Sequence, residues 1–234
     1  MDEQVGSYLH IILETPDSGA FKYLENALAN SFENSLFYIP RTKIEERVAK
    51  ESDNILVWDD RDIACFTLDE GSLINSNSES FLFFSSFLEI SAQFEHLILE
   101  LENQPSYKIG RIVSFIDAEK LCKISAMLQS WLDAVAHFSD VFCITNRNNK
   151  NGKAVGSLLK RYEDMRYPLE SYIISNSKSA KISNILNPTA RRISHIFDSP
   201  ELLENEETPL SDPYLKKLPN GNRAKPIPML FSKD

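Results

Sequence analysis

The loop with the clearest potential for chemistry follows the first apolar run, Tyr8–Glu14, and leads into a helix-like pattern. It contains Ser18 and Gly19, which allow a backbone turn whose N–H groups face an anion, and Lys22, whose ammonium could reach a phosphate. Asp17 stands in the same loop and would place a negative charge beside any phosphate. The shape of the loop thus favours phosphate binding, and its charge opposes it.

Further polar side chains come at the ends of predicted strands. Glu100, Asp117 and Asn146 each end or directly follow such a strand, and Asn149 lies in the same loop as Asn146. The carboxyl ends of parallel strands meet at one edge of a sheet, so we expect these groups near the first loop. A carboxylate there suits Mg²⁺, and an amide suits a nucleotide base. A solvated carboxylate or an asparagine that caps a loop is the simpler explanation of the same residues.

None of the usual catalytic or metal-binding patterns is present. The four histidines show neither HxxxH nor HxH spacing, and the chain has no GxSxG, HExxH or EF-hand sequence. Cys65 stands apart from the other two cysteines, and one thiolate does not make a tetrahedral zinc site. The sequence therefore predicts no catalytic residue and no metal site, with Cys65 as the one candidate ligand.

Short apolar runs alternate with helix-like patterns along most of the chain. The predicted strands are 8–14, 36–39, 55–58, 63–67, 96–101, 109–117, 141–145 and 172–174. The predicted helices are 19–30, 41–53, 81–94, 118–138 and 152–162, and the third of these is aromatic and buried. Apolar strands that alternate with helices indicate an α/β fold, a three-layer α/β/α arrangement with a mostly parallel sheet.

The composition is that of a soluble globular protein. The 234 residues are 42% hydrophobic and 25% charged, and the formal net charge of -9 would repel nucleic acid. No apolar stretch is long enough to span a membrane, and the acidic start is unlike a signal peptide. Three cysteines that cannot all pair fit a reducing compartment. We therefore expect a cytoplasmic protein that binds neither nucleic acid nor membrane.

Residues 198–234 differ in character from the domain predicted for residues 1–197. Six of the eleven prolines fall in this tail, where an acidic cluster, Glu201–Glu207, precedes several basic residues. Such a segment cannot form a core by itself, so it either stays disordered or lies extended along the domain. Its candidate anchors are Leu210, Tyr214, Leu218, Met229, Leu230 and Phe231.

The loop Glu14–Lys22 resembles the phosphate loop of the CobW-type (CobW/UreG/HypB-like) P-loop GTPases, which reads GxxGSGKTT. Ser18 and Gly19 match that motif. The differences are Glu14 and Asp17 for two glycines, Ala20 for the lysine, and Phe21 and Lys22 for the two threonines. The lysine contacts phosphate and a threonine binds magnesium in such proteins, so these differences remove both contacts.

Later segments are also similar to this family, and the resemblance covers roughly residues 5–175. His96–Pro105 resembles its strand that ends in Glu, and Ile112–Ala118 resembles its strand that ends in Val-Asp-Ala. Leu132–Asn146 resembles a helix and a strand whose final Asn opens the guanine-binding motif NKxD. Here that motif reads Asn-Arg-Asn-Asn, so an amide replaces the carboxylate that accepts from guanine. Ile63–Thr67 stands where the family carries a metal-binding CxCC.

The resemblance implies a P-loop GTPase-like fold whose nucleotide-binding residues have been replaced. We therefore expect a non-catalytic binding or scaffold protein without a cofactor. Its partner would be a protein, engaged through the proline-rich tail or the aromatic segment Phe81–Phe94. One alternative is an atypical nucleotide-binding protein or NTPase that holds GTP or ATP with magnesium. It would use Ser18, Gly19, Lys22 and Asn146. Another is a metal-handling protein that retains Cys65.

Overall fold

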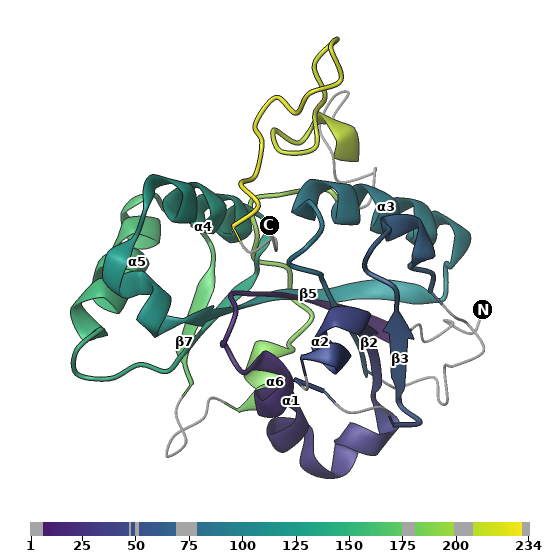
Figure 1. Cartoon of the computed structure of the whole chain (residues 1–234), viewed down its shortest axis with the longest axis horizontal. Coiled ribbons are helices and arrows are strands. Elements are labelled where there is room, and N and C mark those ends of the chain that lie inside the picture. The colour runs from purple at the N-terminus through teal and green to yellow at the C-terminus, as the bar shows by residue number, and fades with distance from the viewer. Residues whose placement is uncertain are drawn as a thin grey trace.

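Seven parallel strands form one sheet in the computed structural model of the chain (Figure 1). The structure describes residues 7–46, 48–49, 52–68, 79–174, 181–198 and 208–230. The strands are β1 (Ser7–Glu14), β2 (Leu36–Pro40), β3 (Ile55–Trp58), β4 (Glu79–Phe83), β5 (Tyr107–Asp117), β6 (Val141–Thr145) and β7 (Glu170–Ile173). They lie side by side in the order β3-β2-β4-β1-β5-β6-β7, so β1 is central.

Helices cover both faces of this sheet. The α-helices of the described residues are α1 (Ala20–Leu28), α2 (Arg41–Glu45), α3 (Ile90–Asn103), α4 (Ala126–Phe138), α5 (Gly152–Asp164) and α6 (Ile182–Ile185). The short 3-10 helices are η1 (Ala29–Asn34), η2 (Ile63–Cys65), η4 (Ala118–Lys123) and η6 (Pro209–Ser211). Helices α3, α4 and α5 lie on one side of the sheet, and α1 and α6 on the other (Figure 1). The predicted three-layer α/β/α fold is confirmed, and the sheet is parallel throughout.

Side chains of the central strands divide between two apolar layers. Leu9, Ile11 and Leu13 of β1 belong to the cluster that includes α3, α4 and α5, whereas Ile12 belongs to the cluster that includes α1. All four side chains are almost completely buried. Burial on both faces explains why these strands have continuous apolar runs rather than an alternating pattern.

The predicted aromatic helix at 81–94 is wrong. Residues Glu79–Phe83 form β4, which lies between β1 and β2, and α3 begins only at Ile90. Phe81 and Phe83 are completely buried in this strand. A strand buried on both faces has the same unbroken apolar pattern as a buried helix. The apolar run also continues into α3, so it is longer than a single strand and its length favours a helix.

The predicted strands at 96–101 and 63–67 are also wrong. Residues 96–101 belong to α3, in which Ile90, Phe94 and Leu97 recur at helical spacing on the buried side. Residues 63–67 begin with the 3-10 helix η2, whose first turn is capped by the Asp62 carboxylate. The segment His96–Pro105 is therefore helical as far as Asn103, where the family resemblance implied a strand that ends in Glu.

Two predicted helices are shorter than expected. The range 118–138 divides into η4 and α4, because Ser125 Oγ accepts a hydrogen bond from Leu128 N at 3.1 Å and caps a new helix. The range 41–53 retains only α2. The helices predicted at 19–30 and 152–162 and the other predicted strands are confirmed, with small shifts at their ends.

The described part of the tail, residues 208–230, packs against the layer of α3 and α4 (Figure 1). Tyr214, Leu215 and Ile227 are buried in the main core cluster, and Leu230 packs partly against it. The Asp212 carboxylate accepts hydrogen bonds from His137 Nε2 and Ser194 Oγ, both at 2.7 Å. Of the two alternatives for the tail, this part thus lies along the domain.

Other candidate anchors of the tail do not act as anchors. Leu210, Leu218 and Met229 are exposed. Phe231 and the acidic cluster Glu201–Glu207 lie outside the described residues.

None of the helices in the described part of the chain combines the length and the apolar composition needed to cross a bilayer.

Substitutions of Gly110 in β5 and of Gly156 in α5 test how β1 packs against β5. A Cβ at Gly110 would lie 2.6 Å from His10 Cε1, and the His10 ring is completely buried and stacked on Phe81. We expect Gly110→Ala to destabilise the protein by about 2 kcal/mol. A Cβ at Gly156 in α5 meets open space, so Gly156→Ala should stabilise by about 1 kcal/mol. Urea unfolding of both variants measures the difference, and equal midpoints would contradict the register of β1 and β5.

The Asp212 contacts predict an acid-sensitive attachment of the tail. Burial alone would raise the pKa of Asp212, but the hydrogen bonds from His137, Ser194 and Tyr214 N outweigh it and hold the pKa below its ordinary 3.8. A depressed pKa contributes stability at neutral pH that is lost as the pH falls through the folded-state value. We expect Asp212→Asn to cost about 1–3 kcal/mol at neutral pH, and the cost to shrink in acid below pH about 4.

Unfolding free energies measured against pH test this expectation. The matched control is Asp164→Asn, because the Asp164 side chain is exposed and pairs with the exposed Lys160 along α5. A cost for Asp212→Asn that does not change with pH would contradict an ionised Asp212.

Candidate functional site

The carboxyl edge of the sheet gathers the loop after β1 and the ends of β5 and β6. The main chain of this loop is tied to β5, since Thr15 N donates to Phe115 O at 3.0 Å and Asp117 N donates to Thr15 Oγ1 at 2.8 Å. Thr15 and Asp117 are both buried. The edge therefore holds the loop in one fixed position next to β5.

The loop turns tightly before α1. Asp17 and Gly19 both have left-handed backbone conformations, with φ of 65° and 70°. Glycine adopts this conformation without strain, and aspartate tolerates it better than most residues. Ser18 N donates to Thr15 O at 3.3 Å and closes the turn. The predicted turn at Ser18 and Gly19 is thus present.

The side chains at the start of the loop are engaged with one another. The Glu14 carboxylate forms an ion pair with Lys43 Nζ, and its other oxygen accepts a hydrogen bond from Ser18 Oγ. Ser18 Oγ in turn accepts from Ala20 N at 3.3 Å. The Lys43 ammonium also lies 5.7 Å from the centre of the Phe83 ring. Lysine, carboxylate and hydroxyl at this point are all bound within the protein.

Asn146 joins the same edge from the end of β6. Its Nδ2 donates to Asp17 O at 3.1 Å and to Asp117 Oδ1 at 3.0 Å. Asn146 has a φ of 52°, which asparagine tolerates better than most residues. Lys120 Nζ bonds Asp17 Oδ2 at 2.9 Å. The Asn146 amide therefore links the first loop to β5.

A second set of side chains, which sequence reasoning missed, orders the loop after β6. Asn151 is fully buried; its Oδ1 accepts from Asn148 N at 2.8 Å and its Nδ2 donates to Asn146 O at 3.0 Å. The side-chain amides of Asn148 and Asn151 also donate to Glu119 Oε1. The run of asparagines before α5 is the sequence signal, because asparagine commonly caps loops and helix ends through its side chain.

Asp60 is another buried carboxylate at this edge. It follows β3 and accepts hydrogen bonds from Thr42 Oγ1 and Ser85 Oγ, both at 2.6 Å, and from Thr42 N at 3.2 Å. Ser85 stands just after β4. Like Glu14, Asp60 has its oxygens satisfied within the protein.

The end of the described tail lies against the same edge. Ile227–Leu230 line a small cavity together with Glu14, Ser85 and Trp131. Its volume of about 30 Å³ has room for no more than a few water molecules. The tail thus covers the carboxyl ends of β1 and β4.

Three predicted site residues take no part in the contacts described above. Lys22 is on the outer side of α1, with its side chain 77% exposed and its ammonium 4.0 Å from Glu25. Asn149 is exposed in the loop after β6. Glu100 was expected at a strand end but lies on α3, where its carboxylate accepts from Leu68 N at 3.0 Å. The structure brings together Asp17, Ser18, Gly19 and Asn146. Lys22 points to solvent and Glu100 lies on α3, whereas Asn149 is exposed in the same loop as Asn146.

The cysteines give no support to a metal centre. Cys65 and Cys122 are exposed, whereas Cys143 is buried in β6, where burial raises the pKa of its thiol. Over the described ranges, no three histidine, cysteine, aspartate or glutamate side chains are grouped so that they could hold a metal ion.

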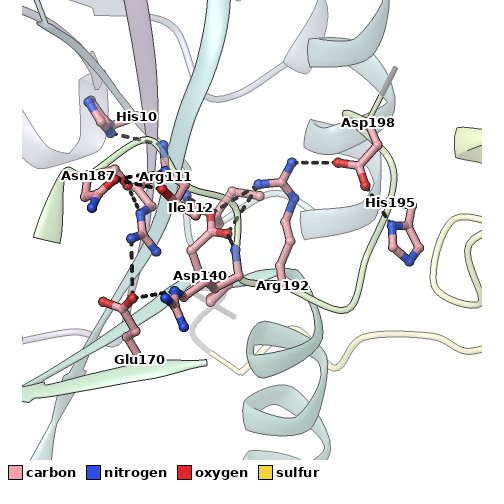
Figure 2. Close-up of polar contacts among 12 residues, drawn as sticks. His10, Arg111, Ile112, Asp140, Glu170, Asn187, Arg192, His195 and Asp198 are labelled. Carbon is pink, nitrogen blue, oxygen red and sulfur yellow. Dashed lines mark hydrogen bonds and ion pairs between the residues drawn. The ribbon is translucent and has the colours of Figure 1, made fainter. Parts of the chain in front are cut away.

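Buried charges also gather at the opposite, amino-terminal end of the sheet (Figure 2). Asp140, completely buried before β6, accepts from Ile112 N at 2.8 Å, from Arg191 N, and from Arg192 Nη1 at 3.3 Å. Arg192 Nη2 donates to Asp198 at 3.2 Å. These contacts fasten the segment after α6 to β5 and β6.

Arg111 and His10 complete this network (Figure 2). The buried Arg111 donates through Nε to Asn187 O, and its Nη2 lies 3.5 Å from Glu170 Oε1. Arg111 N donates to His10 Nδ1 at 3.1 Å, so the proton of a neutral His10 is on Nε2, which faces Glu79. Asp140 is paired with opposite charge and main-chain groups, as expected of a structural network, whereas Nη1 and Nη2 of the buried Arg111 form no hydrogen bond within the described residues.

Comparison with known proteins finds five solved chains whose structures match this one. No family model and no curated protein matches the chain. A crystal structure of a LAO/AO transport system kinase is similar over 72% of this chain and 53% of that chain, with a TM-score of 0.39 and 10% identity. The chain thus spans about half the length of that structure. A likeness of this size does not define a family for the chain.

Asn146 and Asn149 form a matched pair for testing this edge. Asn146→Ala removes two hydrogen bonds and places alanine at a positive φ, so we expect a loss of about 1–2 kcal/mol of stability. Asn149→Ala should stay within about 0.5 kcal/mol of the unchanged protein. Chemical denaturation measures both, and equal stabilities would contradict the role of Asn146 as a link between loops.

Proposed function

We propose that this chain is a non-catalytic protein-binding module, built on an α/β fold that resembles the CobW-type P-loop GTPases. The observation that carries the proposal is the engagement of the edge residues with one another. Glu14 is bound by Lys43 and Ser18, Asp17 by Lys120, and the Asn146 amide by two groups of the neighbouring loops. A nucleotide would have to break these contacts before it could use the same groups.

The charges at this edge support the same conclusion. Glu14, Asp17, Asp117 and Glu119 are near the loop, whereas its two nearby lysines, Lys43 and Lys120, are already in ion pairs. Phosphate groups bind where backbone N–H groups and cations are free to face them. Ala20 supplies no cation at the position of the phosphate-loop lysine.

The fold also bears on which of the two expected segments could bind a partner. The aromatic segment 81–94 does not offer one, because Phe81, Phe83, Phe84 and Phe94 are buried in the core. The tail remains, since it packs on α3 and α4 but leaves Leu210 exposed. We therefore assign partner binding to the face that carries the tail.

A second candidate function is an atypical nucleotide-binding protein. The closeness of Asp17, Ser18, Gly19 and Asn146 at one edge favours it. This alternative lacks a cation for the phosphates, because Lys22 points to solvent.

Titration of the full chain with fluorescent GTP and ATP analogues, with and without Mg²⁺, separates the two functions. We expect no saturable binding at high micromolar nucleotide. Lys22→Ala should leave the titration unchanged, and circular dichroism confirms that both proteins are folded. Saturable binding that unlabelled nucleotide competes away would overturn the non-catalytic proposal, and its loss in Lys22→Ala would identify the missing cation.

A further inference from the structure

A groove with mainly apolar walls runs between α3 and the tail. One wall is formed by Ile98 and Leu99 of α3, and the other by Pro209, Leu210 and Leu215. Its volume of about 530 Å³ can take several apolar side chains of a binding partner. In Figure 1 the tail stands above the layer of α3 and α4 on the side away from the sheet. The groove therefore lies on the outside of the molecule.

The spacing of the lining residues on α3 indicates what shape of partner fits. Glu95, Ile98, Leu99 and Glu102 follow one another at i, i+3, i+4 and i+7. They form a stripe on one face of α3, whose two middle residues, Ile98 and Leu99, are apolar and whose outer residues are glutamates. An apolar pair flanked by charge suits the apolar face of an amphipathic helix. The neighbouring face of α3, with Phe94 and Leu97, is already buried, and Ile98 packs partly against the same core cluster. The outer stripe thus offers a second helix-packing surface.

Ion pairs hold the two walls of the groove in place. The Arg223 guanidinium is buried and bonds both Glu89 and Glu95, and it also donates to Leu215 O at 2.8 Å. Lys217 Nζ bonds Glu95 at 3.1 Å. A groove fixed in this way needs little rearrangement on binding, which favours affinity.

Charge indicates the chemistry of the partner. Lys217 and Glu95 neutralise each other, whereas Glu102, at the other end of the stripe, is exposed and has no ion pair within the described ranges. A basic side chain on the partner would complement it. A second copy of this chain is disfavoured, because two chains with a net charge of -9 repel each other.

We propose that this groove binds an amphipathic helix of a partner protein, with apolar side chains against Leu99 and Leu210 and a lysine or arginine facing Glu102. The proposal rests on the proposed function as a protein-binding module and names the surface and the class of partner. Helix-in-groove recognition of this kind uses apolar anchors at helical spacing.

A model helix tests the proposal with the full chain. The probe is a fluorescent peptide of about 20 residues, with leucine on one face at i, i+3, i+4 and i+7 and lysine on the flanking positions. A second peptide carries glutamate in place of lysine. We expect the lysine peptide to bind, and Leu99→Asp to weaken binding by about tenfold or more. Glu102→Lys should weaken the lysine peptide and strengthen the glutamate peptide.

Met127→Asp is the matched control. Met127 on α4 is 56% exposed, as is Leu99, but it does not line the groove. We expect it to leave peptide affinity unchanged, and both aspartate variants to unfold at the same urea concentration as the unchanged protein. Equal weakening by the two variants, or no binding of the lysine peptide, would overturn the groove as a helix-binding site. Sedimentation that shows a dimer separated by Leu99→Asp would assign the groove to a second copy and overturn the partner helix.

These outcomes are independent of the nucleotide titration, which reports on the carboxyl edge of the sheet. A chain that binds nucleotide and also binds the lysine peptide in the expected pattern would retain the groove and lose the non-catalytic proposal. If the chain binds neither nucleotide nor peptide, the non-catalytic proposal stands and the helix-binding groove is overturned.

Discussion

The ion pair between Glu14 and Lys43 is the interaction on which the carboxyl edge of this protein depends. Both side chains are largely buried, and a carboxylate buried without a partner is strongly destabilising. Lys43 comes from the short helix α2, so the pair also fixes α2 to the end of β1. With Ser18 bound to the same carboxylate, the loop before α1 is held by its own side chains. The groups that would otherwise face a ligand face the protein instead.

The same rule operates at the other end of the sheet. There Asp140 is buried, and it is satisfied by main-chain N–H groups and by Arg192. Arg111 beside it bonds the segment after α6 and faces Glu170. An all-parallel sheet exposes its strand ends on two sides, and here paired charges lie on both. The tail adds a further cover over the ends of β1 and β4.

The groove proposed to bind a partner lies on the outer side of α3 and the tail, away from the paired charges at the strand ends. The ion pairs of Arg223 that fix the tail also shape the groove beside Leu99. The tail is held on the domain because Tyr214 packs into the core and Asp212 bonds His137 of α4. Paired charges thus have two effects in this chain. They occupy the side chains of the first loop, and they fix the groove that is proposed to bind a partner.

The α/β class, the parallel sheet and most of its strands could be predicted from the amino-acid sequence, because apolar runs bounded by turn residues report local burial directly. The sequence also placed Asp17, Ser18, Gly19 and Asn146 at one edge, since parallel strands share their carboxyl ends. It could not distinguish β4 from a helix, because burial on both faces removes the alternating pattern. The pairing of the charges and the position of the groove depend on how the chain folds in three dimensions. Those features join residues far apart in the chain, such as Glu95 and Arg223, and sequence spacing carries no information about such contacts.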